Sequence, residues 1–516
     1  MDEKVLRVPA RHLEVFSSPS LAEMRGAIEA NRVVLAGHDF GVAGLSSRSL
    51  RTLGRREALE TAARPDGSRA ALNDVAIIAS GHQPELFHPG VWIKNHFVSA
   101  LAKRVGGVSL NVVMDSDRVK QRCLAVPVRS RGKIVELSVP VVRAESGVVL
   151  EAAALDGDLV ETCLARIEGA LGDRRMAEAF ARFAECARVI MPECRTVSEF
   201  LWRSRSVFEQ DWALGNLELP VSRLCGMDSF LRFVMWLARQ RERFREVHNE
   251  RLEEYRRAHR IRTGAHPAPN LGLAGDACEM PFWSVRGSLR RRLWAAENRG
   301  RLTLMDDEGE LVALGGDGFA DLRAAVNGGL RLRPRAITNS LFLRLFVADL
   351  FVHGIGGAKY DTITDGVIRD FVGTDPPASA VLSATALLPF ELHDVSEADL
   401  TRTRQLLRDT FWNPERLFSE GDRTNEEVRR LLAERRRLVA GMHEEEKEAR
   451  PRRYERIHEV NETLARRAAG ARKEIEHRLR SVAKMLEENE VMSRRDYPFV
   501  LYPRETLDRL YSFDLD

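Results

Sequence analysis

The sequence lacks the features that mark several large classes of protein. Its six cysteines include no Cys-x-x-Cys pair, so neither a zinc knuckle nor a redox dithiol is indicated, and we assign no metal ligands. The 79 basic and 76 acidic residues leave a net charge of only +3, which makes nucleic acid an unlikely partner. No apolar stretch of signal-peptide length opens the chain, and the most apolar later run, 340–352, is interrupted by Arg344 and Asp349. We therefore expect a soluble, cytoplasmic protein without a membrane partner.

Length and composition indicate a globular protein of several parts. At 516 residues the chain exceeds what one hydrophobic core usually supports, so we expect roughly two to four structural units. Hydrophobic residues at 44% and charged residues at 30% argue against disorder and against a fibrous architecture. Only nine of the 79 basic residues are lysines, which makes the surviving lysines better candidates for chemistry that arginine cannot perform. Those of interest are Lys94, Lys120 and Lys359.

A strand, a loop, a helix and a second strand follow one another in the first third of the chain. The apolar run 75–79 predicts a strand covered on both faces, and the loop 81–90 follows it. Apolar residues then recur at helical spacing up to Val105, and the next apolar strand, 108–114, leads into the acidic segment 115–117. Because a right-handed crossover brings the carboxyl ends of both strands to one edge of a parallel sheet, the loop and the acidic segment should lie together there.

This edge is the predicted functional site. His82 and His88 flank a turn ahead of a helix amino terminus, where two imidazoles could hold phosphate oxygens, and Lys94 could add a positive charge. Asp115 and Asp117 could hold Mg²⁺ through water or orient an amine. Further contacts to a nucleotide, ATP or ADP with Mg²⁺, are assigned to Gly81, Gln83 and Gly90.

Each of these residues also has a structural interpretation. Either histidine could satisfy buried polar groups, Lys94 could be an ordinary lysine on a helix surface, and the two aspartates could close an Asx turn.

The second half of the sheet is predicted from a later apolar segment. A helix over 339–351 opens into the segment 353–361, and a helix over 362–371 and a strand over 380–388 follow. Gly356, Gly357 and Lys359 are further candidates for contacts to the nucleotide, although a glycine cluster after a helix is more often a cap and turn. The side chains of His82, His88, Asp115 and Lys359 should then converge on one cleft.

The remaining segments complete an α/β prediction. Residues 133–143 and 147–150 are expected as strands, and 157–247 as almost wholly helical. The prolines between His266 and Trp283 indicate a rigid loop or a strand edge. The predicted parts are an amino-terminal segment (1–73), the two halves of the core (74–150 and 248–400), a helical insertion (151–247), a linker (401–423), a helical hairpin (424–490) and a tail (491–516).

The hairpin is predicted from capping and periodicity. Thr424 and Glu427 form a capping-box pattern, and Pro451 interrupts the helix that begins there. Apolar residues at a 3-4-4 spacing then form one stripe from Ile457 to Leu486. We expect an antiparallel coiled-coil hairpin whose stripe faces its own first helix or a second subunit.

Short motifs resemble those of the bacillithiol-synthesis cysteine-adding enzyme family. The segment Gly81-His82-Gln83-Pro84-Glu85-Leu86-Phe87-His88-Pro89-Gly90 resembles the family's Gly-Gln-Gln-x-x-Leu-x-x-Gly-Pro segment. The stretch from Arg333-Pro334 to Gly356-Gly357 resembles its later Arg-Pro and Gly-Gly elements. For a divergent relative, this resemblance implies a Rossmann-like core related to nucleotidyltransferases and class I aminoacyl-tRNA synthetases, a helical insertion, and a coiled coil that often mediates dimers. It also implies bacterial thiol biosynthesis, in which cysteine is joined to a sugar-linked amine.

Three functional hypotheses follow. The first is a ligase-like enzyme that joins an amino acid, cysteine among them, to a small amine with the help of a nucleotide or phosphate site. The second is a non-catalytic ligand-binding or scaffolding protein with a degenerate nucleotidyltransferase-like fold. The third, an RNA-binding synthetase relative, depends on Arg286 and Arg290 to Arg292, and the near-neutral charge disfavours it.

Overall fold

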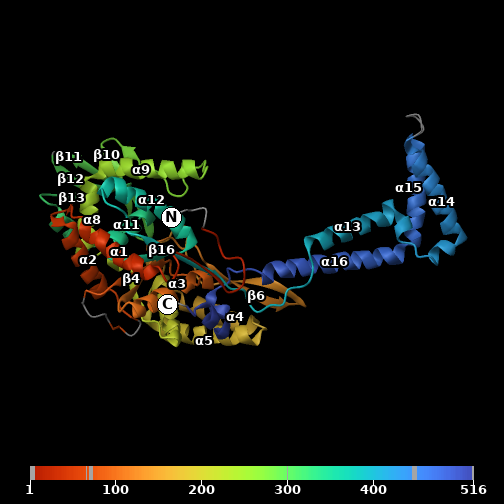
Figure 1. Cartoon of the computed structure of the whole chain (residues 1–516), viewed down its shortest axis with the longest axis horizontal. Helices are drawn as coiled ribbons and strands as arrows, with labels where there is room; N and C mark the ends of the chain where they lie inside the picture. The colour runs from red at the N-terminus through yellow and green to blue at the C-terminus, as the bar shows by residue number, and fades with distance from the viewer. Residues whose placement is uncertain (1–5, 65–66, 69–73, 299, 444–449, 514–516) are drawn as a thin grey trace. The chain divides into compact units, whose positions relative to one another are not determined.

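The computed structural model describes residues 6–64, 67–68, 74–298, 300–443 and 450–513 (Figure 1). The chain divides into two compact units. The first comprises Met1–Val128, Leu137–Leu388 and Arg495–Asp516, and the second comprises Arg129–Glu136 and Pro389–Arg494. Among the described residues, no helix has both the length and the apolar character needed to cross a membrane.

A mostly parallel, six-stranded sheet organises the first unit, which confirms a mixed α/β fold. Its strands lie in the order β1-β16-β15-β4-β5-β8. Five of them run parallel, and β1 pairs antiparallel with β16 at one edge. The strands are β1 (Glu14–Ser18), β4 (Ile77–His82), β5 (Val108–Val113), β8 (Leu217–Pro220), β15 (Leu350–His353) and β16 (Ser379–Thr385).

The strand order reverses at the centre of this sheet. The chain passes from β4 outward to β5 and β8, and then returns to the other side of β4 to form β15 and β16. In open α/β sheets, ligands bind beyond the carboxyl ends of the strands where such a reversal occurs. That point lies between His82, at the end of β4, and His353, at the end of β15.

Helices cover the parallel sheet and account for its fully buried strands. Ile77, Ile78 and Ala79 of β4 are wholly inaccessible to solvent, as expected for a strand covered on both faces. Helix α3 packs against β4, β5 and β16, and α12 packs against β15 and β16. The helices that pack against the sheets or into the hydrophobic cores of this unit are α1 (Met24–Gly37), α2 (Ser47–Thr61), α3 (Pro89–Arg104), α8 (Asp228–Arg239), α9 (Arg241–Ala258), α11 (Ala336–Phe346) and α12 (Ile355–Val367).

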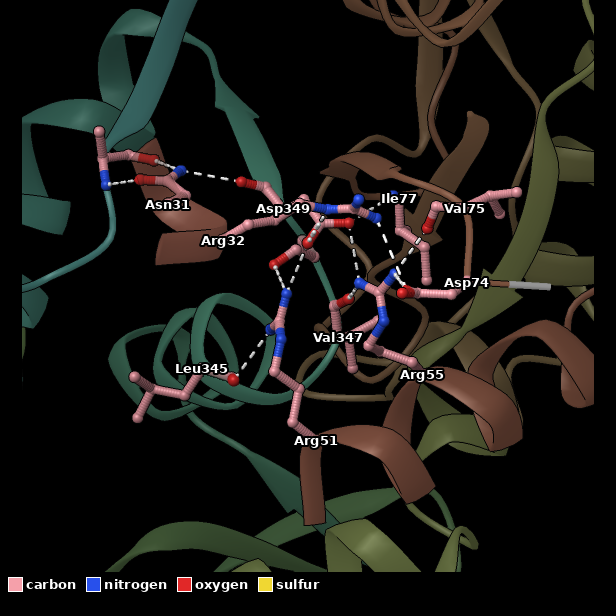
Figure 2. Close-up of polar contacts among 12 residues, drawn as sticks. Asn31, Arg32, Arg51, Arg55, Asp74, Val75, Ile77, Leu345, Val347 and Asp349 are labelled. Atoms are coloured by element: carbon pink, nitrogen blue, oxygen red, sulfur yellow. Dashed lines mark hydrogen bonds and ion pairs between the residues drawn. The ribbon is translucent and has the colours of Figure 1, made fainter. Parts of the chain in front are cut away.

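Asp349, just before β15, joins several elements at the amino-terminal edge of the sheet (Figure 2). Its carboxylate accepts from Arg51 and Arg55, each at 2.8 Å, and lies 3.3 Å from Nε of Arg32. It also accepts from the backbone N–H of Ile77 in β4 at 2.8 Å. Burial acts to raise the pKa of Asp349, but the three guanidinium groups hold it below its usual value. The cluster therefore ties α1 and α2 to two central strands.

A second sheet, wholly antiparallel, was not predicted from the sequence. Its strands lie in the order β13-β12-β11-β10-β14, and β9 adds to β10. Because β10 is buried on both faces, its sequence shows no alternation that would have revealed it. The strands are β9 (Leu273–Ala274), β10 (Ala277–Arg286), β11 (Leu289–Asn298), β12 (Arg301–Asp306), β13 (Gly309–Leu314) and β14 (Leu332–Pro334).

Aromatic side chains join the second sheet to the helices of the first. Phe230 and Phe233 of α8 contact Phe282 of β10, with ring centroids 6.0 and 6.2 Å apart. The same two rings contact Phe342 of α11, each at 5.3 Å. One continuous hydrophobic core therefore extends from the parallel sheet to the antiparallel one.

Three boundaries differ from those that the sequence predicts. The range 157–247 is mostly helical, but β8 within it completes the parallel sheet. Residues 147–150 form isolated bridges and the start of a 3-10 turn instead of a strand. The predicted helix 339–351 is α11 followed by β15, because a short apolar run such as 350–353 does not distinguish a strand from a helix.

The remaining elements of the first unit lie around these sheets. Strands β6 (Cys123–Ser130) and β7 (Lys133–Pro140) form a separate hairpin, whose turn belongs to the second unit. The short pair β2 (Gly41–Val42) and β3 (Leu45–Ser46) precedes α2. The other helices are α4 (Gly157–Ala170), α5 (Arg174–Ile190), α6 (Val197–Phe208), α7 (Val221–Leu224), α10 (Phe319–Asn327) and α17 (Arg504–Leu510).

The α-helices in the described residues of the second unit are α13 (Glu397–Trp412), α14 (Glu426–Ala440), α15 (Arg450–Arg467) and α16 (Ala469–Met492). Figure 1 shows α14 and α15 side by side, and α13 along α16. Val460, Leu464 and Ala468 of the predicted stripe pack against Val428, Leu431 and Leu432 of α14. This part of the stripe therefore faces the preceding helix, while dimerisation through it stays a prediction.

Three details of the second unit correct the sequence-based account. Asn425, not Thr424, caps α14, because its side chain accepts from the backbone N–H groups of Glu427 and Val428. Most of the predicted linker 401–423 is helical and belongs to α13. The stripe also spans two helices, because a break at Ala468 separates α15 from α16.

Candidate functional site

Two glycines of the loop 81–90 are required by packing. A Cβ on Gly81 would lie 2.9 Å from the carbonyl oxygen of Val112 in β5. A Cβ on Gly90 would lie 1.9 Å from the carbonyl oxygen of Ala384 in β16. These positions therefore need glycine for the close approach of strands and helix, whatever contact they make with a ligand.

His88 forms the amino-terminal cap of α3. Its Nδ1 accepts from the backbone N–H of Gly90 at 3.1 Å, so this atom already satisfies one of the helix's free donors. Burial, followed by the charge of Arg495, lowers the pKa of His88 to about 4. The imidazole is neutral at pH 7 and offers a phosphate no positive charge.

His82 is also neutral and lies at the end of β4. Its Nδ1 is 3.1 Å from the carbonyl oxygen of Gln83, and its ring meets the ring of Phe87 edge-on at 4.5 Å. Burial, followed by the charge of Lys94, lowers the pKa of His82 to about 3. Because Nδ1 must donate to that carbonyl, Nε2 carries the lone pair, and the ring can accept a hydrogen bond or a proton.

Lys94 is a buried cation in the second turn of α3. Its side chain extends back to the end of β4, where Nζ donates to the carbonyl oxygen of Gly81 at 3.0 Å. The residue is only 3% exposed, and burial lowers the pKa of its amine to about 8. In the part of the chain that the structure describes, no carboxylate forms an ion pair with Lys94. An ammonium group without a counter-charge therefore lies at the strand end that the sequence indicated.

Asp115 is held by the start of α7. Its carboxylate accepts from the backbone N–H of Ser222 at 2.9 Å and from the Ser222 hydroxyl. Burial, followed by the nearby carboxylate of Glu151, raises the pKa of Asp115 to about 6. Glu151 is itself paired with Arg333 at 2.7 Å. These contacts give Asp115 a structural role that the sequence did not reveal.

Asp117 links the loop to the antiparallel sheet. It accepts from Nε2 of Gln83 at 2.7 Å and from Nη1 of Arg290 in β11 at 3.1 Å, and Lys120 lies 3.7 Å away. Both aspartates are therefore engaged by other side chains, and their predicted role in holding Mg²⁺ through water stays a prediction. Across the described residues, no group of three or more His, Cys, Asp or Glu side chains is placed to hold a metal ion.

The predicted Gly356-Gly357 loop is the first turn of α12. This helix begins at Ile355, directly after β15, so its amino terminus lies at the same edge as the end of β4. Lys359 is exposed on this helix, and its convergence with His82 on one cleft stays a prediction. Asp361, in the next turn, binds Arg344 at 2.6 Å and His353 at 3.0 Å, which ties α11, α12 and β15 together.

The arginines that suggested RNA binding are paired with acids instead. Arg286 binds Asp306 at 2.7 Å, and Arg290 binds Asp117. Arg291 and Arg292 lie 3.0 and 3.4 Å from Glu308 and Asp307. These arginines lie close together because β10 and β11 pair with each other in the second sheet.

The pH dependence of stability should reveal the buried carboxyl group of Asp115. A carboxyl group whose pKa is raised by folding binds more protons in the folded state, so its contribution to stability falls as pH rises from about 4 to about 6. Asp115→Asn cannot ionise but keeps an acceptor for Ser222. The variant should gain roughly 3 kcal/mol relative to the wild type over this window, measured by urea unfolding at a series of pH values. A difference that does not change with pH would contradict the assignment.

Comparison of the chain with protein-family models and with curated proteins finds no match.

Proposed function

We propose that the chain is a ligase-like enzyme whose Rossmann-like parallel sheet binds an anionic small molecule at its carboxyl edge. The anion would be a nucleotide or another phosphate compound, ATP or ADP with Mg²⁺ among them. The observation that carries the proposal is Lys94, a buried ammonium without a carboxylate partner at the reversal of strand order. Burying an unpaired charge is costly, and an anionic ligand would remove that cost.

The surrounding groups are suited to holding an amine beside an anion. The ring of His82 is unprotonated at pH 7, so its Nε2 can accept a hydrogen bond from an amine and orient it, although a pKa of about 3 makes the ring a weak base. The amino terminus of α12 is at the same edge and favours anions through its free N–H groups. Helix α3 adds only its dipole, because Pro89 has no N–H and the next N–H groups donate to His88. Attack of an amine on an activated carboxyl group needs the amine nitrogen held in line with the carboxyl carbon, with the released proton passing to water. The resemblance noted above suggests cysteine as the amino acid joined.

Replacing Lys94 should separate folding from binding. Lys94→Met should raise the free energy of unfolding at pH 7, because it removes a buried charge, and should weaken nucleotide binding by about 10- to 100-fold. The measurements are urea unfolding and isothermal titration with ATP, ADP and inorganic phosphate, each with and without Mg²⁺. Lys103→Met is the matched control, since Lys103 is exposed on the same helix.

Two results would count against the proposal. One is the absence of binding by any of these anions to the wild-type protein at millimolar concentration. The other is an equal affinity in Lys94→Met, which would favour the alternative of a non-catalytic scaffold. In that case His82→Ala should leave partner binding and cellular function intact, whereas an enzyme should lose turnover.

A further inference from the structure

Trp283 of β10 is contacted by two guanidinium groups from different elements. The Cζ atom of Arg335, at the start of α11, lies 4.0 Å from the centre of the indole, and that of Arg290, on β11, lies 5.3 Å away. The two arginine side chains are only 11% and 14% exposed. Stacking on an aromatic face restrains a guanidinium group, so both are held in place before any ligand arrives.

The protein satisfies only part of the hydrogen-bonding capacity of these two groups. Arg335 uses Nη2 to bind Glu279 at 2.5 Å, and Arg290 uses Nη1 to bind Asp117 at 3.1 Å. A guanidinium group carries five N–H bonds. Within the described residues, Nε and Nη1 of Arg335 and Nε of Arg290 are buried without an acceptor. Buried donors without acceptors are costly, and more so when they are charged.

The local charge also favours an anion. Each of the two arginines has a further positive charge near it. Arg118 is near Arg290, and Arg292 is near Arg335. Asp117 is not reserved for Arg290. It also accepts from Gln83 and lies 3.7 Å from Lys120. Asp117 is therefore divided between two cations, Arg290 and Lys120.

The cluster lies next to the site at the end of β4. Asp117 joins Arg290 to Gln83, and Gln83 directly follows His82. A molecule bound at the cluster would thus lie close to His82, which the proposed function assigns to orienting the amine. A ligase needs two substrates in contact, and Lys94 accounts for an anion on only one of them.

We propose that Arg290 and Arg335, held against Trp283, bind an oxyanion of the second substrate, either a carboxylate or a phosphate group. The planar guanidinium matches the two oxygens of such a group in a bidentate arrangement. This inference rests on the proposed function only in naming the ligand a second substrate, because the binding site itself is defined by the two arginines.

Anion titrations in the Lys94→Met background test the subsite without a contribution from Lys94. Succinate and inorganic phosphate are titrated separately at constant ionic strength, and binding is followed by calorimetry and tryptophan fluorescence. The fluorescence change is assigned with Trp283→Phe. We expect saturable binding of at least one anion, and its identity distinguishes a carboxylate ligand from a phosphate ligand.

Substitutions at the two arginines then decide the assignment. Arg290→Gln and Arg335→Gln should each weaken this binding at least about tenfold, and Arg335→Lys should recover part of it. Arg291→Gln is the control, because this residue is on the same strand as Arg290 but is paired with Glu308 at 3.0 Å. Unchanged affinity in both glutamine variants, or no saturable binding of either anion before substitution, would overturn the subsite. Loss of ATP binding on Lys94→Met while succinate still binds would show that the two sites are distinct.

Discussion

Asp349→Ala is expected to lower the free energy of unfolding by about 3–5 kcal/mol. The substitution leaves Arg51 and Arg55, each 13% exposed, without the carboxylate that they share, and Arg32 loses its 3.3 Å contact. It also removes the acceptor for the backbone N–H of Ile77. Breaking a buried ion cluster by removing one partner is more costly than the net value of the intact cluster, because the remaining charges are uncompensated.

The measurement is urea unfolding of the whole chain, monitored through the fluorescence of the buried tryptophans of the first unit. Asp74→Ala is the matched control, because Asp74 lies 3.8 Å from both Arg32 and Arg55 but is 94% exposed. This control should change stability by less than about 0.5 kcal/mol. Equal effects of the two substitutions would show that the buried cluster contributes no more than a surface ion pair.

Arg205→Met should be similarly destabilising at neutral pH, by about 3–5 kcal/mol. Arg205 on α6 is 4% exposed and binds two buried carboxylates, Glu209 at 2.8 Å and Glu218 at 2.7 Å. Burial already raises the pKa of Glu218 despite the arginine. Without Arg205, Glu218 should take up a proton more readily in the folded state.

The sign of the pH effect follows from that uptake. A carboxyl group with a raised pKa in the folded state contributes less stability as pH rises, so the loss in Arg205→Met should be smallest in acid and largest at neutral pH. Unfolding midpoints at several pH values measure it. Arg203→Met, on the same helix but in a surface pair with Glu193, is the control. A loss that is the same at every pH would rule out proton uptake by Glu218.

The local order of elements around the candidate site could be predicted from the sequence. The apolar run 75–79, the helical spacing up to Val105 and the strand 108–114 are confirmed as β4, α3 and β5, with the two strands parallel. Such segments are recognisable because hydrophobic periodicity is a local property. The rarity of lysine in this chain indicates Lys94 as a candidate site residue from the sequence alone. Its burial in the structure is a physical reason for the same assignment.

The partners of these residues could not be predicted, because they come from distant segments. Asp115 binds Ser222, and Asp117 binds Arg290, which is 173 residues away. Arg290 and Trp283 lie close together because β11 pairs with β10 in the second sheet. No local sequence pattern predicted this pairing. The capping role of His88 was foreseeable from its place before Pro89 at a helix start, although histidine is not a common cap.

The pairing of β4 with β15 has a consequence for biosynthesis. Ser80 of β4 donates to the carbonyl oxygen of Val352, a residue 272 positions later in the chain. During translation, β4 and its loop must remain without this neighbour until most of the first unit has been made, and at about 5–20 residues per second that interval lasts tens of seconds. A nascent chain therefore lacks the reversal of strand order, where we propose that an anion binds, until β15 has joined the sheet. Such late, long-range closure is slow in folding generally, and it leaves the apolar edge of β4 available to chaperones in the meantime.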